Sequence, residues 1–162
     1  MSSKTKIGAL IASVVATIAV AGGTIATAGA ASESSGNQLA GTWVVTINRP
    51  APLPPLTSLQ VYTGKGSMIE SANDSPARTP QYASWTRIQG REYAATGVFF
   101  RFDPQTGAFI GRQKINRTIE LSDDAQSFTF QAHVTIYDAS SNVLANVAVA
   151  GTGQRLQVET QP

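Results

Sequence analysis

Residues 127–138 read SFTFQAHVTIYD, with apolar side chains at every second position from Phe128 onward. Because successive side chains of a β-strand point to opposite faces of a sheet, this alternation is typical of a strand with one buried face. Phe130 and Val134 belong to the apolar face, whereas His133 belongs to the opposite face and is expected to point to solvent. The segment therefore predicts a β-sheet protein.

The sequence on both sides of this segment repeats the same pattern. From Leu39 onward no window keeps a 3.6-residue apolar period over three turns, while alternation by two and β-branched residues recur. Segments rich in glycine, proline, asparagine and aspartate separate the alternating stretches. The expected strands cover 41–48, 56–63, 67–71, 82–88, 92–102, 108–121, 127–138 and 143–158.

Nearly all of these strands are joined by hairpin-length turns, which favours sequential antiparallel pairing. An open sheet of this kind has two exposed edges, and pairing of its first and last strands removes that aggregation hazard. We therefore predict an all-β fold, an eight-stranded antiparallel up-and-down β-barrel. A two-sheet β-sandwich is the alternative, because it has similar strand spacing.

The first 30 residues have the organisation of a secretory signal peptide. Lys4 and Lys6 precede an uncharged stretch, and small residues precede a cleavage position after Ala30. A retained membrane anchor is the alternative, because residues 7–31 are long enough to span a bilayer. Both organisations predict a protein that is secreted or lies at the cell-envelope exterior, with a flexible leader over 31–38 and a β-barrel domain over 39–159.

Composition and charge exclude several classes of function. The formal net charge of +2 includes Lys4 and Lys6, so the exported part is neutral. A neutral domain without clustered cations is not expected to bind nucleic acid or, once the signal is removed, a membrane. The chain has no cysteine and one histidine, which leaves little for metal or triad chemistry. We expect no metal, no cofactor and no catalytic residue.

The interior of such a barrel is either filled by side chains or hollow enough for one small molecule. Small residues at expected inward positions, such as Ala132, Gly151 and Gly153, favour residual space. The competing interpretation is that the phenylalanines simply fill the core. The expected ligand-binding residues are Phe100, Phe102, Phe109, Gln113, Arg117, Phe130 and Val134.

Arg117 has the same strand parity as the apolar residues Ile115 and Ile119, so it is predicted to project inward. An unpaired buried charge costs several kcal/mol, and an inward Arg117 therefore needs an acidic or carbonyl partner, a ligand anion or water. Alternatively, a bulge or a register slip places Arg117 outside.

One motif resembles a known group of barrels. Gly41-Thr42-Trp43 opens the first expected strand, and Arg155 lies in the last. This resembles the calycin group, comprising lipocalins, fatty-acid-binding proteins and avidins, in which a Gly-X-Trp packs at the closed end of the barrel near a late arginine. The resemblance implies that Trp43 and Arg155 form this structural pair.

The motifs that define single calycin families are missing. The sequence has no lipocalin Thr-Asp-Tyr motif, no helical lid of the fatty-acid-binding type and no tryptophan-rich biotin site, so no ligand is carried over. The chain also looks like small, uncharacterised exported barrel proteins with a proline-rich first connection, which implies no function.

The residues favour a non-catalytic binder or carrier of a small apolar molecule, with Gln113 or Arg117 as its polar anchor. The alternative is a small-barrel cyclase or isomerase acting on an apolar substrate, which a resemblance to allene-oxide-cyclase-like barrels allows; its candidate polar groups are Arg117, Gln113, Tyr93 and Glu70. A further alternative is a surface interaction module that uses loops 72–81 and 50–55.

Overall fold

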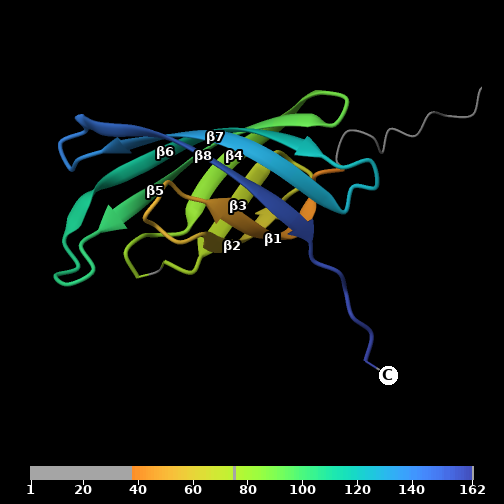
Figure 1. Ribbon diagram of the computed structural model, residues 1–162, viewed down its shortest axis with the longest axis horizontal. Helices are drawn as coiled ribbons and strands as arrows, with labels where there is room; N and C mark the ends of the chain where they lie inside the picture. Colours follow the sequence, from red (N-terminus) through yellow and green to blue (C-terminus); the bar gives the residue numbers. More distant parts are fainter. Residues whose placement is uncertain (1–37, 75, 162) are drawn as a thin grey trace, which may run out of the picture. The chain divides into compact units, whose positions relative to one another are not determined.

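The computed structural model describes residues 38–74 and 76–161, which form an all-β domain (Figure 1). The described residues include no helix with the length and apolar character needed to cross a bilayer. The predicted signal peptide and most of the predicted leader lie outside the described residues. The strands are β1(Gly41–Asn48), β2(Leu56–Tyr62), β3(Ser67–Ala72), β4(Gln81–Gln89), β5(Glu92–Phe102), β6(Phe109–Leu121), β7(Ser127–Tyr137) and β8(Val143–Arg155).

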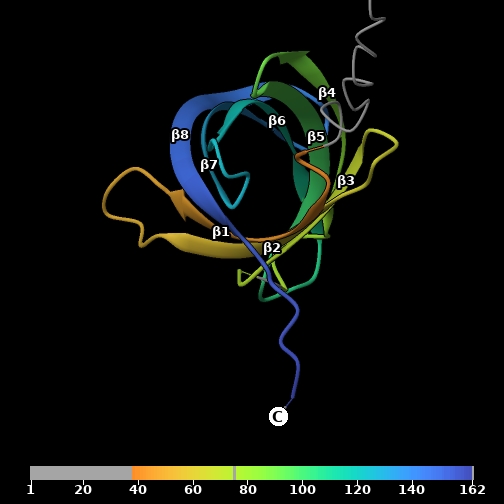
Figure 2. The ribbon, with the colours of Figure 1, turned by 90° about the vertical axis from the view of Figure 1, so that its right-hand side faces the viewer.

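The eight strands form one closed antiparallel barrel in sequence order, as predicted, and not a sandwich. β1 pairs with β8 from Trp43 opposite Arg155 to Asn48 opposite Ala150. Viewed from one end, the strands form a complete ring (Figure 2). Closure gives both β1 and β8 a second partner, so neither strand leaves its backbone groups as a free edge.

Connections alternate between the two ends of the barrel. The end reached by loops 49–55, 73–80, 103–108 and 138–142, on the left in Figure 1, is called the open end below. The opposite end, where β1 begins and β8 finishes, is called the closed end. Because each strand runs from one end to the other, residues far apart in sequence meet at the same depth of the barrel.

The expected turn at 103–107 forms at the open end. A side-chain oxygen of Asp103 accepts hydrogen bonds from the backbone N–H groups of Gln105 and Thr106 at 2.9 and 2.8 Å. These bonds hold the pKa of the Asp103 carboxyl below its ordinary value. Gly107 completes the turn with a positive φ of 71°.

β7 alternates as its sequence predicts. Its apolar residues from Phe128 to Val134 are buried, and His133 is exposed. Arg117 on β6 pairs with Ala132 of β7 and is likewise buried, so the prediction that it projects inward is confirmed.

The space expected beside the β8 glycines is filled by aromatic rings. An added Cβ at Gly151 would lie 2.6 Å from the ring of Phe130, and one at Gly153 would lie 2.3 Å from the ring of Phe128. These glycines therefore make room for neighbouring phenylalanines and do not mark a hollow.

The expectation that Phe100, Phe102 and Phe109 face the interior is wrong. Phe100 and Phe109 are 49% and 46% exposed, and Phe109 stacks edge-on against both Phe100 and Phe102 on the outer face. On β5 the inward parity belongs to Phe99, because Ala95 lies opposite the inward Arg117.

A β-bulge explains the position of Phe109. The register between β5 and β6 shifts where Arg101 pairs with Gly111 and Phe102 pairs with Phe109, which leaves one extra residue on β6. Gly111 adopts a positive φ of 130° at this point. A bulge reverses which face the preceding residues occupy, so strict alternation from Ile115 back to Phe109 assigns the wrong side.

Candidate functional site

Aromatic side chains fill the interior at the closed end. Trp43 is fully buried, and its ring centroid lies 4.8 Å from that of Phe128. Its indole N–H donates to the Leu39 carbonyl at 3.0 Å. Tyr62, Trp85 and Tyr93 continue this layer through edge-on ring contacts. Rings in this arrangement pack densely, so side chains fill the interior at this end.

Arg155 covers the outer side of this layer. Its guanidinium carbon lies 4.2 Å from the Trp43 ring centroid. The guanidinium also donates to the carbonyls of Ala125 and Ala40, each at 2.8 Å. Burial lowers the pKa of Arg155, whereas the cation–π contact and the carbonyl oxygens stabilise its charged form. Trp43 and Arg155 therefore form the pair that the sequence motif implies.

A buried polar layer, formed by Ser58, Gln60, Glu70, Gln81 and Arg117, lies next to the aromatic layer. Arg117 is 5% exposed and donates to Gln60 at 3.0 Å, to Gln81 at 3.0 Å and to Glu70 at 3.3 Å. Gln60 in turn donates to Glu70 at 2.8 Å. Charge and hydrogen bonds together compensate the desolvation of the Arg117 guanidinium.

Electrostatics keep Arg117 charged inside the barrel. Burial lowers the pKa of its guanidinium, but the charged and hydrogen-bonding groups around it, the Glu70 carboxylate among them, more than offset this and raise the pKa overall. The Tyr62 hydroxyl donates to Gln60 at 2.8 Å, and burial raises the pKa of Tyr62, so this hydroxyl stays neutral.

A second arginine reaches Glu70 from the open end. Arg78, in the loop between β3 and β4, bonds Glu70 at 2.9 Å and Asp74 at 2.7 Å. Its guanidinium carbon also lies 4.4 Å from the Phe99 ring centroid. Glu70 thus lies between two arginines, and Arg78 ties the loop to the polar layer.

A cavity of about 260 Å³ occupies the interior between the polar layer and the open end. Strands β5 to β8 contribute Phe99, Ile115, Phe130, Val134 and Val149 to its walls, and the β1–β2 connection contributes Leu53. Its polar lining includes Arg117, Glu70 and Arg78. Apolar walls with a few polar groups are typical of sites for small molecules.

The predicted ligand-binding residues divide between this cavity and the outer face. Gln113, Arg117, Phe130 and Val134 line the cavity. The three phenylalanines on the outer face do not. The polar groups considered for a cyclase or isomerase lie at different depths: Tyr93 among the aromatic rings, Glu70 and Arg117 in the polar layer, and Gln113 in the cavity wall.

Sequence reasoning missed most partners of Arg117. Gln60 lies on a strand whose inward face the sequence did not assign, Gln81 falls in the expected loop 72–81, and Glu70 was considered only as a polar group of the enzyme alternative. One signal was present on β2, where Ser58, Gln60 and Tyr62 share a parity that faces inward. A run of polar residues at alternating positions is the mark of a polar barrel interior.

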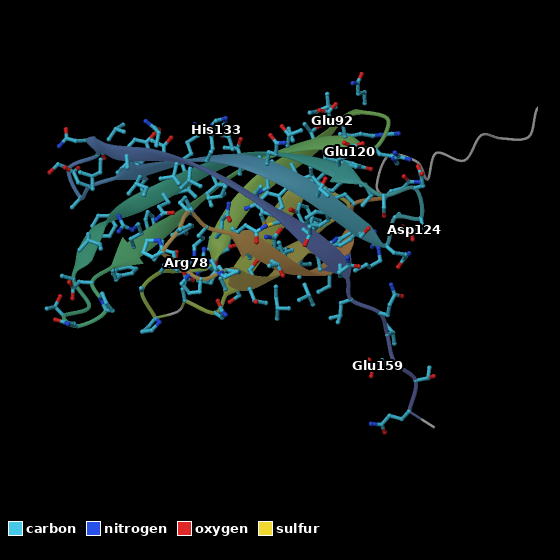
Figure 3. All side chains as sticks on the ribbon, in the orientation of Figure 1. Arg78, Glu92, Glu120, Asp124, His133 and Glu159 are labelled. Atoms are coloured by element: carbon cyan, nitrogen blue, oxygen red, sulfur yellow. The ribbon has the colours of Figure 1, made fainter. Side chains whose placement is uncertain are left out.

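A second hollow, of about 600 Å³, lies on the outer surface of β5, β6 and β7. Its lining includes Glu92, Glu120 and His133, which Figure 3 shows along one outer face, away from Arg78. Glu92 and Glu120 lie directly opposite each other on paired strands. In the described part of the chain no three potential metal-ligating side chains gather.

Comparison with known proteins finds no family model, no curated protein and no solved structure that matches this chain. Any assignment of function therefore depends on the geometry of the cavity.

Proposed function

We propose that the protein is a non-catalytic binder or carrier of a small apolar molecule, which occupies the cavity at the open end. The observation that carries the proposal is the asymmetry of the interior: packed rings at one end and a hollow with apolar walls at the other. The volume of about 260 Å³ lies just below the range of pockets for drug-sized ligands, which favours a small ligand.

The buried polar layer supports the same proposal. Arg117, Glu70 and their amide partners hold one another in place, so the base of the cavity is rigid before any ligand enters. A preformed cavity loses little conformational entropy on binding. We also propose a calycin-like relationship, supported by the Trp43–Arg155 stack, and a location outside the cytoplasm, supported by residues 1–30.

Filling the cavity is expected to weaken binding. Val147 lines the cavity, whereas its neighbour Ala148 is exposed on the outer face of β8. Val147→Trp is expected to weaken binding of the neutral fluorescent probe N-phenyl-1-naphthylamine by about tenfold or more, equivalent to about 1.4 kcal/mol. Ala148→Trp is the matched control and is expected to bind the probe like the unmodified protein. Fluorescence titration measures both.

A second variant separates a filled cavity from a misfolded barrel. Val149→Phe adds volume at the next inward position of β8, and circular dichroism and thermal unfolding report whether each variant folds. Equal binding by the unmodified protein and by folded Val147→Trp and Val149→Phe would reject the cavity as the binding site. Failure of the unmodified protein to bind any of a panel of neutral apolar compounds would reject the proposed function.

A further inference from the structure

The charges that line the cavity are unbalanced. Its lining includes four arginines but only two carboxylates, Glu70 and Asp74. Arg78 bonds both carboxylates, and Arg117 bonds Glu70 from the other side. These four groups neutralise one another, so the excess positive charge belongs to the two remaining arginines, Arg49 and Arg101.

Neither Arg49 nor Arg101 forms an ion pair within residues 38–74 and 76–161. Arg49 donates its Nε–H to the Pro54 carbonyl at 2.8 Å. The side chain of Arg101 makes no hydrogen bond among the described residues. Its backbone forms an isolated β-bridge with Arg78. The nearby turn carboxylates of Asp103 and Asp138 do not line the cavity and accept bonds from their own turns.

Both unpaired cations lie at the open end. Arg49 directly follows the last residue of β1, and Arg101 precedes the last residue of β5. Gln113 lines the cavity close by, on the strand paired with β5, and its side-chain amide has no hydrogen-bond partner in the described chain. Deeper in the cavity the walls are formed by Phe99, Ile115, Phe130, Val134, Val147 and Val149.

We propose that the ligand is an amphipathic anion, with its apolar part among these walls and its acidic head at the open end against Arg49 and Arg101. This inference rests on the proposed function and adds the chemical class of the ligand. An anionic head balances the positive charge that the protein leaves unpaired, and a planar guanidinium binds a carboxylate through two parallel hydrogen bonds. Gln113 supplies a further amide donor for the head.

The polar layer does not offer an equivalent place for the head. Three of the five N–H groups of Arg117 are directed to Gln60, Gln81 and Glu70, so the layer already uses most of its donors, although the Nε–H has no partner in the structure. An anion there would also lie beside the carboxylate of Glu70, and two like charges in a buried site repel strongly. The acidic head therefore faces the open end and the apolar part points inward.

A matched pair of ligands tests the inference. Decanoate and decan-1-ol share an alkyl chain and differ in the charge of the head. We expect decanoate to displace N-phenyl-1-naphthylamine at about tenfold lower concentration than decanol, the effect of a charge-assisted hydrogen bond. Arg101→Gln is expected to abolish this preference for decanoate while decanol binds as before. Arg49→Gln is expected to reduce the preference. Arg112→Gln is the control.

The control arginine lies outside the cavity. Arg112 lies at the same end on β6, but it stacks on Tyr137 and donates to Ser141 at 2.8 Å outside the cavity. Equal displacement by decanoate and decanol, displacement by neither, or an equal loss of both in Arg101→Gln would overturn the anionic head. If the neutral probe itself fails to bind the unmodified protein, the proposed function falls as well.

Discussion

Arg117→Met is expected to lower the free energy of unfolding by about 3–5 kcal/mol, the cost of removing one partner from a buried ion pair. Methionine has a similar length, so the main loss is the charge and its bonds to Gln60, Gln81 and Glu70. Glu70, which is 1% exposed, keeps only Arg78 as a cationic partner. Urea unfolding followed by tryptophan fluorescence measures the change.

A double variant separates the effect of charge from the effect of packing. In Arg117→Met/Glu70→Gln a neutral amide replaces the carboxylate of Glu70, so the loss of Arg117 leaves no buried negative charge at this position. We expect this variant to be more stable than Arg117→Met alone. Arg112→Met, on the outer face, is expected to change stability by no more than about 0.5 kcal/mol. A similarly small effect of Arg117→Met would contradict a structural role for the polar layer.

Trp43→Ala is expected to lower the free energy of unfolding by about 3–5 kcal/mol. Trp43 is fully buried and holds three separate groups together: the Phe128 ring, the Leu39 carbonyl and the Arg155 guanidinium. Its removal leaves a cavity at the closed end and takes the aromatic face away from Arg155. Thermal and urea unfolding measure the loss.

Trp43→Phe is the graded control for this prediction. It keeps an aromatic ring beside Phe128 and Arg155 but loses the hydrogen bond to Leu39, so we expect a smaller loss of stability. Because the polar layer separates the closed end from the ligand cavity, a folded Trp43→Ala protein is expected to bind the neutral probe normally. Lost binding in that folded variant would mean that the two ends are coupled.

Alternation by two predicted an all-β fold, and the short turns predicted pairing in sequence order. β7 places its apolar residues inward without interruption, and nearly all the turns are short enough for each strand to pair with its neighbours in sequence. The need to protect two sheet edges then indicated the β1–β8 pairing. The Gly-X-Trp motif similarly indicated that Trp43 and Arg155 meet at one end.

Which residues of β5 point inward was harder to predict, because apolar residues occur at both odd and even positions of this strand. Phe100 and Phe102 were expected to face inward, yet Phe99 is the ring that the barrel buries. Pairing of Ala95 with Arg117 across the sheet decides which face of β5 is inward, and the bulge before Gly111 decides the position of Phe109 on β6. Both are long-range features that a single strand does not encode.

The cavity was expected from small inward residues, and this reasoning holds for Ala132, which lines it, but not for the glycines of β8. The glycines of β8 suggested space, but the rings of Phe128 and Phe130 fill it. The cavity lies instead between the polar layer and the open end, where smaller side chains such as those of Ala132 and Val149 line it. The volume of such a cavity depends on which side chains from different strands lie at the same depth of the barrel. Predicting this requires the register between neighbouring strands.

The most direct test of a ligand cavity at the open end is a methyl NMR titration of valine-labelled protein with decanoate and with N-phenyl-1-naphthylamine. We expect saturable shifts for the inward methyl groups of Val134, Val147 and Val149, with little change at the exposed Val61 and Val143. Shifts confined to the exposed valines, or no shifts at saturating ligand, would contradict it.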